Sequence, residues 1–201
     1  MVNPHEHDRF VLRQKFAMVI NRYFFSLPEQ EDQPFCFVEQ KRMKLKEDIR
    51  FYTDQAKTEE LMRIKARQMF DPRARYDVTT ATGEPIGQIQ KVFGASLFRS
   101  TYSLFDAQGN ETARVQERSL PVAIIRRTIG FIPFVGGFAE WIPIPYDFEF
   151  KRGEQLLGTH SRRRWKITDT YDIDLTPDSA RTLDRRLVLA LAVAMDALQA
   201  R

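Results

Sequence analysis

The chain has 201 residues, of which 43% are hydrophobic and 29% charged, so it is long and apolar enough for one packed domain with a mild net charge of +4. A single cysteine, Cys36, excludes an intrachain disulfide and a cysteine-based zinc site, and it favours a reducing compartment. The first ten residues lack the apolar segment of a signal peptide, and no segment reaches the ~20 apolar residues of a spanning helix, so we expect a cytoplasmic protein.

The first part of the chain predicts a polar tail followed by short strands. Residues 1–8 are polar, and we expect them to be a flexible tail. The segment 28–34 is a loop by composition, since two prolines enclose acidic and amide side chains. Apolar or alternating runs predict strands over 10–18, 22–27, 35–41, 49–53 and 61–68.

The second part repeats one plan: an aromatic-led strand, a glycine turn, and a strand with a small residue in its middle. The repeats occupy 76–91, 102–117 and 146–160, and a last strand follows over 169–176. Turn glycines supply the positive φ of a tight hairpin, and a mid-strand small residue relieves crowding against another backbone or a central helix. The turn glycines are Gly83, Gly109 and Gly153, and the small residues are Gly87, Ala113 and Gly158.

The segment 181–199 predicts a helix that is apolar on every side, because each residue from Leu187 to Met195 is apolar. Surface helices have one apolar stripe, so this helix requires an environment that surrounds it. It is too short to span a bilayer and is closed by charges at both ends. We therefore expect one all-β domain, a closed antiparallel barrel of about twelve strands around a buried hydrophobic C-terminal helix. A barrel of that width needs such a plug.

The segment 119–145 interrupts the repeat as an apolar insertion rich in proline and glycine. It could cap the barrel end, form an oligomer interface, or enter a membrane surface. Basic and aromatic side chains together are typical of an interfacial anchor. The candidate membrane or partner contacts are Arg126, Arg127, Phe131, Phe134, Phe138 and Trp141.

Basic side chains form three clusters that could bind an anionic partner such as phosphate. Alternatively, they are solvated strand faces neutralised by acidic neighbours. Without a stacking platform or a recognition-helix motif, we do not expect nucleic acid to bind. The candidate headgroup-binding residues are Arg63, Lys65 and Arg67 on one strand, and Arg162, Arg163, Arg164 and Lys166 around Trp165. The third cluster is Lys41, Arg42, Lys44 and Lys46.

No pattern indicates catalysis, a metal or a cofactor, and we predict a protein that is not an enzyme. His5 and His7 lack a third ligand, and adjacent strand residues such as His160 and Ser161 point to opposite faces. We expect Asp172 and Asp174 to face outward and pair with Arg162 and Arg164. By alternation with Phe35 and Phe37, Cys36 is expected to face outward. There is no P-loop or dinucleotide motif.

The chain resembles the tubby C-terminal-like superfamily, and within it the scramblase-like and LURP-one-related branch. The resemblance is carried by residues 10–15, 76–91, 105–117 and 183–198. It implies a twelve-stranded barrel around a hydrophobic helix. Tubby relatives bind phosphoinositide headgroups through exterior Lys and Arg, and scramblase relatives are tied to phospholipid membranes. The chain lacks the Cys-rich palmitoylation stretch and the acidic calcium loop of scramblases.

Three functional hypotheses remain open. The first is a non-enzymatic module that binds phospholipid headgroups or docks on an anionic membrane surface, which would place it peripherally at a membrane. The second is a soluble scaffold that forms a homodimer or binds a protein partner through 119–145. The third is a carrier of a small apolar ligand in a cavity beside the helix.

Overall fold

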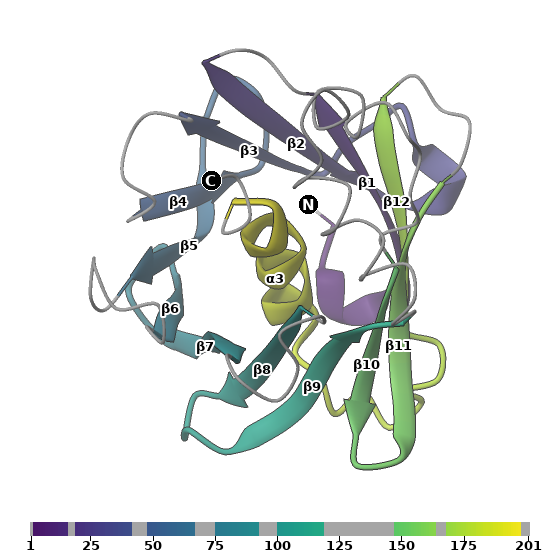
Figure 1. The fold of residues 1–201 in the computed structure, drawn as a ribbon. Coiled ribbons are helices and arrows are strands. Elements are labelled where there is room, and N and C mark those ends of the chain that lie inside the picture. The colour runs from purple at the N-terminus through teal and green to yellow at the C-terminus, as the bar shows by residue number, and fades with distance from the viewer. Residues whose placement is uncertain are drawn as a thin grey trace, which may run out of the picture.

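The fold is described from a computed structural model, which describes residues 2–15, 19–41, 48–66, 75–92, 100–118, 147–163 and 168–197. Twelve antiparallel strands close into a barrel in which β1 pairs with both β2 and β12 (Figure 1). The predicted fold class is therefore confirmed. The strands are β1 Arg9–Lys15, β2 Ile20–Ser26, β3 Cys36–Lys41, β4 Asp48–Tyr52, β5 Glu60–Ala66, β6 Arg75–Thr80, β7 Pro85–Val92, β8 Thr101–Asp106, β9 Glu111–Glu117, β10 Phe148–Arg152, β11 Gln155–Arg162 and β12 Asp169–Asp174.

The core consists of side chains packed between the inner faces of the strands and the helix α3, Arg185–Ala197, which lies inside the barrel (Figure 1). Every side chain from Leu187 to Met195 is buried, as its all-round apolar pattern predicts. Gly87 allows the close approach of helix and sheet. A Cβ at this position would clash with the carbonyl oxygen of Phe105 and lie 3.0 Å from Leu187 Cδ2.

The two ends of the barrel differ in how the strands are joined. At one end, named here the turn end, tight turns with positive-φ Gly83, Gly109 and Gly153 close the three predicted hairpins. Helix α3 also begins there, since Leu187 packs on Gly87 near the β6–β7 turn. The opposite end has the carboxyl ends of all odd-numbered strands, because neighbours in the barrel are antiparallel.

The turn end is closed by a buried arginine that holds the start of α3 to two loops. The Arg185 side chain is 1% exposed, and its Nη1 donates to Asp178 Oδ2 at 2.5 Å. Its Nη2 donates to Asp8 Oδ1 at 2.7 Å. The helix begins at Arg185 rather than at Arg181, because the Asp178 carboxylate accepts the backbone N–H groups of Thr182 and Leu183.

The N-terminal segment, predicted to be a flexible tail, contacts the start of α3. Pro4–Glu6 form a 3-10 turn (η1) that packs against α3. Arg181 donates to the carbonyl oxygens of His5 and Glu6 and contacts the Asp8 carboxylate at 3.2 Å. Two backbone carbonyl groups and the Asp8 carboxylate of this segment are thus partners of arginines far along the chain.

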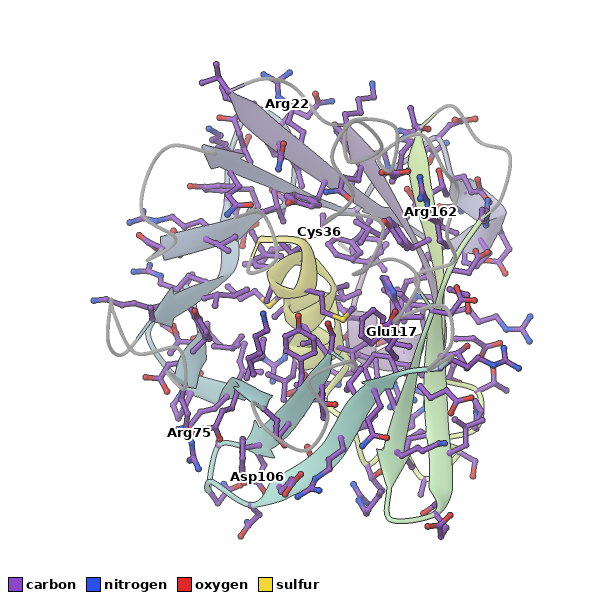
Figure 2. All side chains as sticks on the ribbon, viewed as in Figure 1. Arg22, Cys36, Arg75, Asp106, Glu117 and Arg162 are labelled. Carbon is purple, nitrogen blue, oxygen red and sulfur yellow. The ribbon has the colours of Figure 1, made fainter. Side chains whose placement is uncertain are left out.

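The outward orientation predicted for Cys36 is wrong. Cys36 is 1% exposed and belongs to the core, and it lies between β3 and α3 (Figure 2). The outer face of β3 instead has Phe37, which packs on Phe24 of β2 with ring centroids 5.3 Å apart. An apolar pair on the outer face made the strand apolar on both sides, so apolarity alone did not identify the inner face.

Candidate functional site

In the first basic cluster, Arg63 is bound by other groups of the barrel, whereas Lys65 has no partner among the described residues. Arg63 donates to Glu60 Oε1 at 2.7 Å and to the carbonyl oxygen of Ala81 at 3.2 Å. Lys65 is exposed, and within the described part of the chain it makes no hydrogen bond or ion pair. Arg67 lies outside the described residues. The cluster thus offers Lys65 to a ligand, while Arg63 stabilises the strand.

The second basic cluster is held by acidic side chains. Arg162 is hydrogen-bonded to Asp169, and Arg163 binds the Asp172 carboxylate through three contacts of 2.6 to 2.9 Å. Arg163 also donates to Glu31 Oε1 at 2.8 Å, and these hydrogen bonds raise the pKa of its guanidinium. Arg164 and Lys166 lie outside the described residues.

The predicted pairing of Asp172 and Asp174 with Arg162 is wrong, because the strand register places Arg162 on the other face of the sheet. Arg162 is opposite Tyr171 on the inner face, whereas Asp172 is opposite Ser161 on the outer face. Asp172 therefore binds Arg163, where the chain leaves the ladder. Asp174 lies 3.5 Å from Arg9. The predicted placement of His160 and Ser161 on opposite faces is confirmed, since His160 is opposite the core residue Ile173.

The inner face becomes polar toward the end opposite the turns, which the sequence analysis missed. Tyr23 Oη donates to Gln40 Oε1 at 3.2 Å. Gln14 and Glu117 are also buried, on the last inward positions of β1 and β9. The signal was present in the strand alternation, since each of these residues continues the inward-facing positions of its strand. Polar side chains on the last inward positions indicate an end of the core.

His160 is a further buried polar residue of the inner face, and its pKa is strongly shifted. Its ring is 3% exposed, stacks on Tyr171 at a centroid distance of 4.8 Å, and meets the Phe148 ring edge-on. Burial lowers its pKa to about 4, so the ring is neutral near pH 7. Neither ring nitrogen has a hydrogen-bond partner among the described residues. Among the described residues, no hydrogen bond joins the ring to a nucleophile or a carboxylate, as a catalytic triad requires.

Strand polarity brings the predicted functional segments to one end of the molecule. Strands β3, β5, β9 and β11 all run toward the end opposite the turns. The segments 42–47, 67–74, 119–146 and 164–167 follow those four strands directly. The segments that contain Arg67, most of the second basic cluster, the third basic cluster and the apolar insertion are therefore joined to the barrel at the same end.

The connections at that end, named here the basic end, differ in charge from those at the turn end. The basic-end connections contain Arg42, Lys44, Lys46, Arg67, Arg73, Arg99, Arg118, Arg126, Arg127, Arg163, Arg164 and Lys166, with Glu47, Asp71, Glu140 and Asp147. The segments at the turn end contain Glu6, Asp8, Glu29, Glu31, Asp32, Asp54, Glu59, Glu84, Glu154, Asp178 and Asp184, with Lys57 and Arg181. The connections joined at the two ends thus differ in the sign of their charge. Residues 27–35 nevertheless return along the barrel, since Glu31 binds Arg163 and Asp32 lies 3.9 Å from Arg13.

A family model, LURP-one-related, matches residues 36–196. The chain belongs to the LURP-one-related family. This family is part of the tubby C-terminal-like superfamily, which confirms the assignment made from the sequence. The matched range begins at β3, so β1 and β2 complete the barrel from outside it. No curated protein and no solved structure matched the chain.

Among the described residues, no group of three or more His, Cys, Asp or Glu side chains could hold a metal ion. No helix among them has both the length and the apolarity needed to cross a bilayer. The candidate contacts in the apolar insertion, from Arg126 to Trp141, lie outside the described residues.

Proposed function

We propose that this LURP-one-related domain is a non-enzymatic module that docks on anionic phospholipid surfaces through its basic end. The observation that carries the proposal is the difference in charge between the connections joined at the two ends of the barrel. Phosphate-bearing surfaces attract Lys and Arg clusters, with a gain of about 1 kcal/mol for each cation near the surface. An acidic turn end orients the same molecule, because an anionic surface repels it.

The proposed contact set is narrower than the basic residues of the sequence. Arg63, Arg162 and Arg163 are held by carboxylates of the barrel, and binding phosphate through them would require breaking these ion pairs. Lys65 is exposed without such a partner. The proposed headgroup contacts are Lys65, Lys44, Lys46, Arg67, Arg164 and Lys166.

The apolar insertion fits the same surface. It follows β9, which runs to the basic end, and it contains Arg126 and Arg127 near Phe131, Phe134, Phe138 and Trp141. Aromatic and basic side chains together are the composition that is stable at the level of lipid headgroups. Electrostatic attraction would bring the basic end to the surface, and the aromatic side chains would enter it.

The test is flotation of the full chain with neutral and anionic vesicles at low and physiological salt. Replacing Lys44, Lys46 and Arg67 with Gln removes three cations from the basic end. At about 1 kcal/mol each, the expected loss is roughly a hundredfold in affinity for anionic vesicles. The matched control replaces Arg9, Lys57 and Arg152 with Gln, which removes the same charge near the turn end and is expected to change affinity less than twofold.

Equal losses in the two triple variants would show that binding follows net charge alone, and would overturn the proposed orientation. A chain that forms a dimer in light scattering and ignores both kinds of vesicle would overturn membrane docking in favour of the protein scaffold. Binding to anionic vesicles that weakens with salt is the expected result.

A further inference from the structure

A cavity of about 240 Å³ lies beside α3 toward the turn end, away from the proposed membrane contacts. Its deepest residues, Cys36, Met62 and Leu189, are almost fully buried and come from β3, β5 and α3. Half-buried Val2, Pro4 and Phe35 form further parts of its wall. The three buried residues form the floor of the cavity, and the half-buried residues form its accessible wall.

The lining favours an apolar ligand. Burial raises the pKa of the Cys36 thiol far above its usual range, so this sulfur is uncharged and acts as a small apolar group. Met62 and Leu189 present only thioether and hydrocarbon. An apolar cavity of about 150 Å³ binds benzene, and scaling its six carbons to this volume gives about ten carbon atoms.

The residues at the mouth of the cavity determine which kind of head group a ligand can place there. Exposed Asn3 and partly exposed Arg186 line the mouth. Both are already bound: Asn3 Nδ2 donates to Glu6 Oε1 at 3.1 Å, and Arg186 donates through two nitrogens to the Asp184 carboxylate. The guanidinium is neutralised by this pair, and further carboxylates surround the turn end, so an anionic head is disfavoured.

We infer that this cavity binds the alkyl chain of a single-chain compound with an uncharged head, inserted tail first from the turn end. The chain lies over Cys36, Met62 and Leu189, along the half-buried wall, and the head meets solvent beside Asn3. This site is independent of vesicle docking, since the two use opposite ends of the barrel.

The first test measures binding of primary alcohols to the full chain by calorimetry. Each methylene that enters an apolar site is worth about a fourfold gain in affinity, so octanol is expected to bind about 15-fold more tightly than hexanol. The cavity is filled at about ten carbons, and dodecanol is expected to bind within about twofold of decanol. Absence of binding, or a gain that continues unchanged to dodecanol, would overturn the site.

The second test fills the cavity from its wall. Leu61 lines the cavity and is half-buried, and Leu61→Trp is expected to weaken octanol binding at least tenfold. Leu156→Trp makes the same change at an exposed position of β11 and is expected to leave binding within twofold. Equal binding by both variants would show adsorption elsewhere. If Leu61→Trp does not fold, the affinities of the alcohol series remain the test of the cavity.

Two further ligands test the charge of the head group and whether the bound alkyl chain belongs to a membrane lipid. Octanoate is expected to bind more weakly than octanol, and tighter binding would overturn the uncharged head. Monomeric dihexanoyl phosphatidylcholine is expected not to bind, and its binding in place of octanol would assign the cavity to a membrane lipid. Vesicle flotation of Leu61→Trp is expected to match the unmodified chain, so failure of either proposal leaves the other standing.

Discussion

At the scale of single residues, His160 shows how the barrel keeps an ionisable group neutral. The imidazole is enclosed by Phe148 and Tyr171, and protonation would bury a charge without a partner among the described residues. The neutral ring therefore contributes to packing. At a pH low enough to protonate an imidazole in water, the same ring destabilises the folded state.

This state makes stability depend on pH in a defined window. The pKa of His160 is about 4 in the folded chain and ordinary, about 6.5, in the unfolded chain. Since the unfolded chain binds the proton first, stability is complete above pH 6.5 and falls as the pH drops toward 4. The loss is on the order of 3 kcal/mol. Urea unfolding at pH 7, 5.5 and 4 measures it.

His160→Phe is the matched variant, because it keeps an aromatic ring and removes the proton site. The difference in unfolding free energy between the variant and the unmodified chain is expected to shift by about 3 kcal/mol in favour of the variant from pH 7 to 4. Asp8 and Asp178 have lowered pKa values, so their contribution is lost only below about pH 4 and is common to both proteins. Parallel pH profiles would contradict the assignment.

At the scale of elements, the start of α3 depends most on the Asp178 carboxylate. Burial alone would raise the pKa of Asp178, but hydrogen bonds from Leu183, Thr182 and Arg185 outweigh it and keep the pKa low. Asp178 therefore combines a helix-initiating turn with a buried ion pair. Its loss leaves the Arg185 guanidinium buried with only Asp8 as a charged partner.

Asp178→Ala is expected to lower the unfolding free energy by about 3 to 5 kcal/mol, the usual effect of breaking a buried ion pair. Asp184→Ala is the control, since Asp184 also pairs with an arginine of the first turn but is partly exposed. Its expected cost is about 1 kcal/mol. Urea unfolding compares the two, and an equal cost would mean that Arg185 is satisfied without Asp178.

The elements could be predicted from the sequence to the extent that period and turn chemistry determine them. Alternation and turn glycines located the strands, and the all-round apolar run identified the core helix. Side-chain partners could not be predicted, because they depend on strand register. A shift of one residue decides whether Arg162 or Arg163 meets Asp172. Cys36 was misplaced because Phe37 and Phe24 form an apolar pair on the outer face.

At the scale of the whole molecule, the barrel has no core without its helix. The inner faces of the strands and α3 form one continuous hydrophobic cluster. A barrel of twelve strands is too wide for its own side chains to fill. The difference in charge between the two ends and the alkyl cavity both depend on this packing, since the helix fixes the barrel shape and forms one side of the cavity.

Removal of residues 181–201 is therefore expected to abolish cooperative folding, as measured by thermal unfolding followed by near-ultraviolet circular dichroism. Removal of residues 198–201 alone is the control, and it is expected to retain cooperative unfolding because every described core residue remains. A truncated chain without 181–201 that still melts cooperatively would show that the strands can close on themselves.

The closure of β1 on β12 also determines when this protein can fold during synthesis. Arg9 has Asp174 as a ladder partner, and the helix that fills the barrel follows still later. Contacts between such distant parts of a chain make folding slow. Strands that are neighbours in sequence can pair as they emerge, but β1 has no second neighbour until β12 has left the ribosome, and α3 follows later still. The nascent chain therefore exposes its aromatic inner faces throughout translation. Such a chain requires protection from aggregation until α3 has emerged.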